Sequence, residues 1–283
     1  MAINSIKDNL TKESIISDIK LCIGADIKKE NIYLLVEGED DIKFLKTFLS
    51  DNVYISESYS GKSGVECIVD EVFPDDNRVI GICDRDYSIE NHSYKIFYYD
   101  YNCMEMMILS NDHVFQKLCA EYYKGKTPVK QLRINLLKKL KYLSIIRMCN
   151  ERNGWRKNFK AVNLNTVWDK IEKELNNNEI INKINNSSTI GFNNAELQQI
   201  EQEYEKEWNE EEYFFYTQGH DFTTLYALIC SQHNKNKGPR YDEIESSLRV
   251  GFSENDFMRT KLYDELIKYE HKNKVVICNK MTS

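Results

Sequence analysis

The chain has 283 residues, of which 41% are hydrophobic and 29% charged, with only three prolines and a net charge of −7. This composition can bury one large core or two smaller ones, and it excludes a disordered chain. Since no apolar run is long enough to cross a bilayer and the N-terminus lacks a signal-peptide pattern, we expect a soluble, cytoplasmic protein without membrane contact. The eight scattered cysteines form no Cys-x-x-Cys, which favours reduced, mostly buried thiols.

Strands and helices alternate in the first part of the chain. Apolar or alternating runs predict four strands, at residues 32–36, 53–60, 78–83 and 94–100. Helical spacing follows the first strand, and a turn that opens a helix follows the second. From residue 101 helical patterns dominate, most clearly over 129–148. The order is typical of an α/β fold with a largely parallel sheet, followed by a mainly helical C-terminal region.

Acidic side chains follow two of the predicted strands. Glu37 ends the first strand, with Asp41 close behind it, and Asp84 and Asp86 follow the strand at 78–83. Because ligands bind at the carboxyl ends of parallel strands, we expect these four carboxylates to converge on one rim. Together they would raise one another's pKa values, and a hard cation would neutralise them, which predicts a magnesium site. Alternatively the acids are solvated or cap helices, with Asp40 or Asp41 capping the next helix.

A family resemblance supports the magnesium interpretation. The sequence VEGEDD at 36–41 and DRD at 84–86, each after an apolar strand, resembles the Toprim fold of topoisomerases, bacterial primases and overcoming-lysogenisation-defect nucleases. Both the Glu-Gly-x-x-Asp and the Asp-x-Asp patterns are complete. GKSGV at 61–65, DYNCMEMMIL at 100–109 and GHDFTTL at 219–225 are similar to a Toprim-like family whose best-known member is the effector subunit of the PARIS anti-phage system.

The resemblance implies a Mg²⁺-dependent endonuclease, with Mn²⁺ as a substitute. Glu37 would be a general acid/base or a metal ligand, Asp41, Asp84 and Asp86 would hold the metal, and Glu105 would be the extra acid of nuclease members. For Glu105, a buried acid paired with a lysine is the alternative. The chemistry agrees independently, since cations must neutralise the charge that grows on a phosphodiester at the transition state.

The same resemblance implies partners and a division of the chain. RNA is expected as the substrate over DNA, with transfer RNA favoured. The protein would be the toxic effector of an anti-phage abortive-infection system, in which an ATPase subunit restrains it. A homodimer is possible. We expect a Toprim-like catalytic domain over residues 1–110 and a helical substrate- and partner-binding region over 111–283. The alternative function is a non-catalytic interaction subunit, whose vestigial Toprim site accompanies a basic helix that binds an acidic partner protein.

Two short motifs carry further candidates. GKS at 61–63 lacks the first glycine of a P-loop, because Ser56 stands there, so Lys62 is expected either to reach a substrate phosphate near the carboxylates or to lie in a plain turn. In GHDF, Asp221 would cap a helix with His220 packed at the junction, or both would complete the site by binding substrate or orienting a carboxylate.

The charge is distributed unevenly along the chain. Residues 117–160 hold thirteen Lys or Arg against two Glu, interleaved with aromatic residues, which predicts a surface for phosphates and bases. The alternatives are a solvated helix face or contact with the acidic patch of a neighbouring subunit. That patch, 171–215, has eleven Glu against three Lys, is rich in Asn, and is interpreted as an exposed insertion or linker. The candidate substrate-binding cations are Lys138, Lys139, Lys141, Arg147 and Arg156.

Overall fold

The computed structural model describes residues 11–87, 93–233 and 238–279. These residues form two compact units. Unit 1 holds the described residues up to Asp100 together with those from Ser253 onward, and unit 2 is Tyr101–Phe252. The division differs from the boundary predicted at residue 110, because the chain leaves unit 1 after its last strand and returns to it near the C-terminus.

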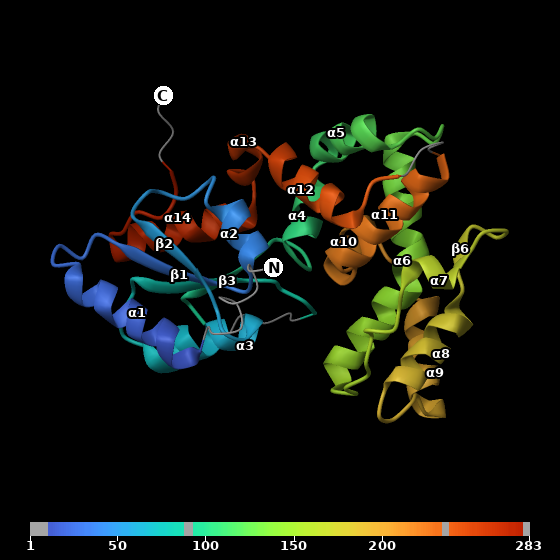
Figure 1. Cartoon of the computed structure of the whole chain (residues 1–283), viewed down its shortest axis with the longest axis horizontal. Coiled ribbons are helices and arrows are strands. Elements are labelled where there is room, and N and C mark those ends of the chain that lie inside the picture. The colour runs from blue at the N-terminus through green and yellow to red at the C-terminus, as the bar shows by residue number, and fades with distance from the viewer. Residues whose placement is uncertain (1–10, 88–92, 234–237, 280–283) are drawn as a thin grey trace, which may run out of the picture. The chain divides into compact units, whose positions relative to one another are not determined.

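A parallel sheet forms the centre of unit 1 (Figure 1). All four predicted strands are confirmed: β1 is Ile32–Val36, β2 Val53–Glu57, β3 Val79–Cys83 and β4 Ile96–Tyr98. They lie in the order β2-β1-β3-β4, and every neighbouring pair is parallel. Every residue of the two central strands is buried, which explains their uninterrupted apolar sequences.

Helices cover both faces of this sheet. One face carries α1 (Lys12–Ala25), α3 (Gly61–Glu66) and a short π-helix (Cys67–Val72), which bury a cluster that includes Ile15, Leu35 and Val65. The other face carries α2 (Glu39–Leu45), α13 (Glu254–Phe257) and α14 (Lys261–Asn273) (Figure 1). The resulting three layers confirm the predicted α/β class.

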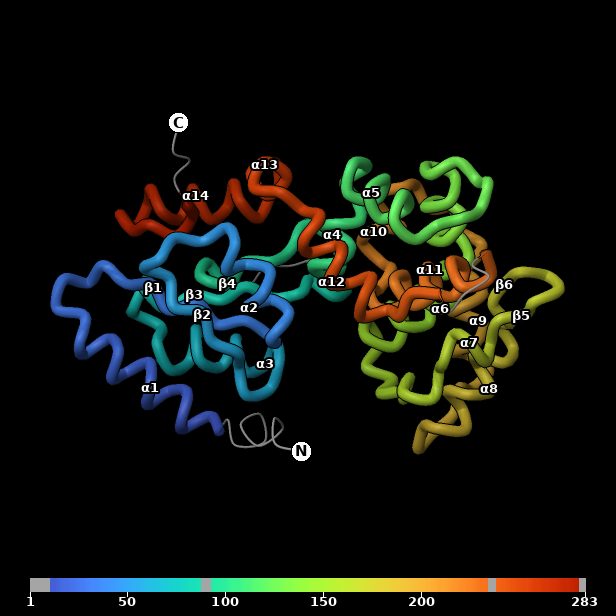
Figure 2. The backbone as a smooth tube through the Cα atoms, turned by 45° about the horizontal axis from the view of Figure 1, so that its top comes forward, coloured from blue at the N-terminus to red at the C-terminus, as the bar shows by residue number. Residues whose placement is uncertain are grey.

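The C-terminal helices complete the second of these faces. Phe257 stacks on Phe48 with ring centroids 4.6 Å apart, and the ring of Tyr269 lies edge-on to Phe97 at 5.4 Å. The carboxylate of Asp100 accepts hydrogen bonds from the first two backbone N–H groups of α14. Figure 2 shows the red C-terminal segment beside the blue and teal strands. Hydrophobic burial therefore joins two ends of the chain that are far apart in sequence.

A buried lysine joins β4 to the π-helix. Lys95 is 1% exposed, and its ammonium donates hydrogen bonds to the carbonyl oxygens of Val69 and Phe73. Burial lowers the pKa of this lysine. The ammonium satisfies carbonyl groups where the helix ends, a role that the sequence pattern does not signal.

Unit 2 is built around one long helix, α6 (Val129–Asn153), which confirms the helix predicted over 129–148. It ends at Gly154 in the left-handed conformation, with φ 61°. The other elements are α4 (Met104–Ser110), α5 (Asp112–Tyr122), α7 (Leu164–Val167), β5 (Trp168–Asp169), β6 (Glu174–Leu175), α8 (Asn177–Ser187), α9 (Asn194–Glu205), α10 (Glu210–Tyr216), α11 (Gly219–His233) and α12 (Tyr241–Gly251).

The Asn-rich segment 171–215 is folded, so its interpretation as a linker is wrong. The side chains of Asn176, Asn193 and Asn209 each accept a hydrogen bond from the first turn of α8, α9 and α10, respectively. Buried isoleucines then fix two of these helices to the rest of the unit, for example Ile184 in α8 and Ile200 in α9. Asparagine is a strong N-cap, so a composition typical of linkers here marks helix starts.

The described residues bear on two predictions, one about membrane-spanning helices and one about the cysteines. None of the helices in this part of the chain is long and apolar enough to span a bilayer. The eight cysteines form no disulfide among the described residues. Six of them are buried, as predicted.

Candidate active site

The candidate carboxylates lie where the sheet reverses its winding order. From β1 the chain passes through α2 to β2 on one side, and then through α3 to β3 on the other side of β1. The carboxyl ends of β1 and β3 are therefore neighbours, which is where open α/β sheets bind ligands. Glu37 follows β1, whereas Asp84 and Asp86 follow β3. The structure brings the two acidic motifs to one edge, as predicted.

Glu37 links the two acidic motifs and has a raised pKa. Its Oε1 accepts a hydrogen bond of 2.7 Å from the backbone N–H of Asp84, which links the two motifs directly. Burial, with smaller contributions from the negative charges of Asp86 and Asp41, raises the pKa of Glu37 to about 7, although the Asp84 N–H and Lys62 oppose this. Glu37 can therefore exchange a proton near neutral pH, as a general acid or base must.

Lys62 lies among the carboxylates, at the start of α3. Its Nζ donates to the backbone oxygens of Asp84 and Arg85, at 3.0 and 3.2 Å, and contacts Asp86 Oδ2 at 3.3 Å. The same ammonium lies 5.1 Å from the ring centre of Tyr98. Lys62 thus holds the segment after β3, and it supplies a positive charge beside the acids; its contact with a substrate phosphate stays a prediction.

Asp41 has a structural role, so the capping alternative is confirmed for this residue. Its Oδ2 accepts a hydrogen bond of 3.0 Å from the backbone N–H of Gly38, at the start of α2. Its Oδ1 accepts one of 2.8 Å from the hydroxyl of Tyr99. An acid in the first turn of a helix is favourable, and both carboxylate oxygens are already engaged.

The acidic edge offers oxygen donors for a metal ion, but these donors are not gathered closely around one point. Among residues 11–87, 93–233 and 238–279, no three His, Cys, Asp or Glu side chains are grouped closely enough to hold a metal as they lie. The donors nevertheless suit a hard cation, because all are carboxylate oxygens and the charges of Asp86 and Asp41 raise the pKa of Glu37. A cation there would compete with Lys62 for Asp86. The ligand set Glu37, Asp41, Asp84 and Asp86 stays a prediction.

Glu105 belongs to unit 2, in the first turn of α4. Burial raises its pKa, a contribution of the same sign comes from Glu245, and Arg249 opposes it. A Cβ atom at Gly219 would lie 2.6 Å from the Cβ of Glu105, so only glycine permits this packing. The alternative of a buried acid with a basic neighbour therefore gains support, with an arginine in place of the expected lysine. Its catalytic role stays a prediction.

Several cations of 117–160 have acidic or carbonyl partners within unit 2. Lys139 pairs with Glu174, and Lys141 donates to the backbone oxygens of Tyr204 and Lys206. Lys157, whose side chain is 2% exposed, pairs with Glu196 at 2.9 Å. The folded segment 171–215 of the same chain therefore balances part of this positive charge, and the predicted contact of 117–160 with nucleic acid stays a prediction.

Two other cations that were predicted to bind substrate are exposed to solvent. Lys138 and Arg156 are both exposed. Arg156 follows the end of α6 and adopts a left-handed backbone conformation, with φ 56°. Their contact with nucleic acid stays a prediction.

Arg147, His220 and Asp221 line one cavity of unit 2, of about 520 Å³. The guanidinium of Arg147 donates to both carboxylate oxygens of Asp221, at 2.8 and 3.0 Å. His220 Nδ1 lies 3.5 Å from Glu245, and this contact raises the pKa of His220. Asp221, in the first turn of α11, is thus paired with Arg147 of α6. The contact of Glu245 with His220 was not predicted from the sequence, because no local motif indicates it.

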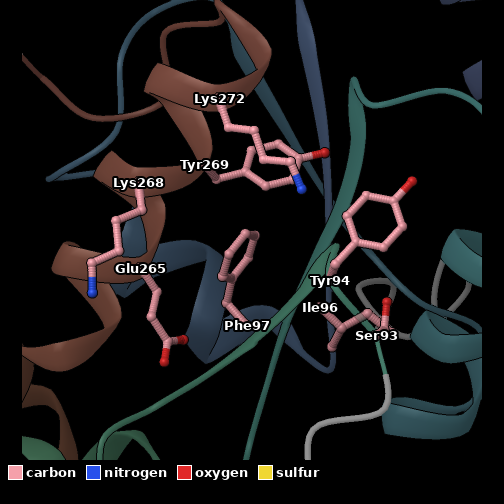
Figure 3. Close-up of a pocket in the computed structure, with 8 residues that line it drawn as sticks. All are labelled: Ser93, Tyr94, Ile96, Phe97, Glu265, Lys268, Tyr269 and Lys272. Atoms are coloured by element: carbon pink, nitrogen blue, oxygen red, sulfur yellow. The ribbon is translucent and has the colours of Figure 1, made fainter.

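Unit 1 also contains a smaller cavity, of about 240 Å³, between β4 and α14 (Figure 3). Figure 3 shows aromatic rings along it, and the ammonium of Lys272 lies 5.5 Å from the ring centre of Tyr94. The hydroxyl of Tyr269 donates to the backbone oxygen of Asn77. None of the predicted site residues lines this cavity.

The sequence was also compared with known proteins. No family model matches it, and no curated protein matches it.

Proposed function

We propose that the chain is a metal-dependent Toprim nuclease that cleaves phosphodiester bonds in nucleic acid. The observation that carries this proposal is the hydrogen bond from the Asp84 backbone to Glu37, which joins the Glu-Gly-x-x-Asp motif to the Asp-x-Asp motif at the winding reversal of the sheet. The raised pKa of Glu37, to about 7, adds a group suited to proton transfer.

Each residue has a defined part in this proposal. Glu37 would take or give a proton at the cleaved bond, Asp84 and Asp86 would hold Mg²⁺ or Mn²⁺, and Asp41 would keep its place at the start of α2 beside them. Bound there, the cation would supply charge neutralisation for the phosphodiester. Lys62, now against Asp86, would turn to the substrate phosphate once the carboxylate has another counter-ion.

The substrate and the biological role that we propose follow from the resemblance of the motifs to the Toprim-like family. RNA is favoured over DNA, with transfer RNA as the substrate class, in a toxic effector of an anti-phage system that an ATPase subunit restrains. Sequencing of cellular RNA and a check of DNA integrity after induction would separate these substrates. Intact RNA together with fragmented DNA would contradict the RNA assignment.

The nuclease proposal is tested with substitutions at the carboxylate edge. Asp86→Asn and Glu37→Gln should each abolish cleavage of single-stranded RNA and DNA by the purified full chain, whereas Asp75→Asn, at an exposed acid, should cleave like the wild type. Chelation should stop cleavage, Mg²⁺ or Mn²⁺ should restore it, and Ca²⁺ should not, because its coordination is larger and looser. Folded carboxylate variants with undiminished cleavage would refute the proposal and favour the interaction-subunit alternative.

A further inference from the structure

The cavity of unit 2 has the size of a small-molecule site. Its volume of about 520 Å³ lies within the range of ligand pockets, roughly 300–1,000 Å³. Its lining comes from the C-terminal half of α6, the segment 159–165 that runs into α7, the start of α11 and the start of α12. Elements far apart in sequence therefore build one concave surface.

Planar groups form the walls of this cavity. The Arg147 guanidinium, held by Asp221, lies 4.6 Å from the ring centre of Phe159. The side chains of the Arg147–Asp221 pair are only 16% and 6% exposed, so this guanidinium is a fixed plane. The rings of His220 and Tyr241 have centroids 5.0 Å apart and are nearly perpendicular, and Tyr241 is 48% exposed. Planar side chains of this kind stack on nucleobases.

Polar groups with unused capacity also line the cavity. Thr224 Oγ1 is buried and has no hydrogen-bond partner among the described residues. The amide side chains of Gln218 and Asn165 line the same space. Amides offer both a donor and an acceptor, as the edges of bases require, and a buried hydroxyl without a partner is costly unless a ligand or water satisfies it.

The charge of the lining fits a ligand with few negative charges. Asp221 balances Arg147, and Glu245 lies beside His220. The remaining cation of the lining is Lys160, which is exposed. One exposed ammonium in the lining of an otherwise balanced cavity suits one phosphate group.

We propose that this cavity binds the base of a single unpaired nucleotide, with Lys160 on its phosphate. The base would lie against the Tyr241 ring and Arg147, with its edge hydrogen-bonded by Thr224 and Gln218. The inference rests on the proposed action on nucleic acid, but it concerns substrate selection: an unpaired nucleotide would be read in unit 2, apart from the cleavage chemistry. The same chemistry would accept a free nucleoside monophosphate, so the experiment includes both sources.

Binding is measured with the full chain carrying Glu37→Gln, so that strands stay intact, by fluorescence anisotropy of a labelled single-stranded RNA. Tyr241→Ala should weaken binding about 5- to 150-fold, the equivalent of about 1–3 kcal/mol per stacked base. Tyr241→Phe keeps the ring and should bind normally. Lys160→Ala should weaken binding and flatten its salt dependence by about 0.7 for one phosphate contact, whereas Lys170→Ala, at an exposed lysine outside the cavity, should change neither.

A second variant separates ligand binding from folding. Thr224→Val keeps the shape and removes the hydroxyl, so binding should fall about 2- to 12-fold, the equivalent of about 0.5–1.5 kcal/mol. Its melting temperature should stay equal or rise, because an unpaired buried hydroxyl is removed. A purely structural threonine would leave binding unchanged.

Further outcomes distinguish the sources and the proposals. A fully paired duplex and strands of abasic residues should bind more weakly than the unpaired RNA. If a free nucleoside monophosphate binds and Tyr241→Ala abolishes that binding while strands are unaffected, the cavity holds a free nucleotide and the strand-reading inference is refuted. If cavity variants bind strands normally while wild type cleaves them, this inference fails and the nuclease proposal stands. If wild type neither binds nor cleaves nucleic acid, the proposed function fails with it.

Discussion

Replacing Glu37 by Gln should stabilise the metal-free protein above neutral pH while abolishing its proposed activity. Glutamine can still accept the hydrogen bond from the Asp84 N–H, but it cannot ionise. In the wild type, the ionised carboxylate must be held in a buried place near Asp86 and Asp41. The ionised carboxylate therefore destabilises the folded wild type, whereas the variant has no such charge.

The magnitude follows from the pKa of Glu37, raised from 4.5 to about 7. Because the folded state keeps this proton where the unfolded chain has lost it, the free energy of unfolding falls as the pH rises from 4.5 through 7. At about 1.4 kcal/mol per pKa unit, the wild type loses up to about 3 kcal/mol across this window. Glu37→Gln lacks the ionisable group, so its free energy of unfolding should not fall in this way. At pH 8 that free energy should be up to about 3 kcal/mol higher than in the wild type, and near pH 4.5 the two proteins should differ little.

Urea denaturation followed by far-ultraviolet circular dichroism, at pH 5 and pH 8 with a chelator present, measures both differences. Glu66→Gln, at an exposed glutamate of α3, is the matched control and should behave like the wild type at both values. Addition of Mg²⁺ at pH 8 should then stabilise both the wild type and Glu37→Gln, because the carboxylates proposed to hold the metal, Asp84 and Asp86, are unchanged in the variant. A Glu37→Gln variant that is no more stable than the wild type at pH 8 would refute the assigned burial and charge repulsion.

Three further predictions concern stability. Lys95→Ala leaves the carbonyls of Val69 and Phe73 without their donor and should lower the free energy of unfolding by about 2–5 kcal/mol in urea denaturation. The control Lys28→Ala, at an exposed lysine, should change it very little. A loss below about 0.5 kcal/mol for Lys95→Ala would contradict the buried contact. Asn193→Ala removes the N-cap of α9 and should cost about 1 kcal/mol, with Asn194→Ala as the control, and equal melting curves would argue against the cap. Arg147→Ala leaves Asp221 buried without its partner and should cost about 3–5 kcal/mol, an amount that an exposed substrate-binding arginine would not show.

The sequence by itself determines the α/β core and the acidic edge. Apolar runs of strand length, such as IYLLV at 32–36, can be buried only in a sheet covered on both faces, and their order implies parallel pairing. The acids after β1 and β3 then meet because the carboxyl ends of neighbouring parallel strands share an edge. Local pattern was sufficient here, since each inference involves residues within one strand and the turn that follows it.

Only the tertiary structure decides which charges are balanced. Lys139 and Glu174 are far apart in sequence but pair in the folded unit, so a count along the chain overstates the free charge of 117–160. Asparagine-rich composition misleads in the same way, since a residue such as Asn193 caps a helix only when an apolar face, here Ile200, finds a core. The cavity of unit 2 is likewise invisible in sequence, because its hydroxyl, rings and guanidinium come from α6, α11 and α12 and meet only through packing.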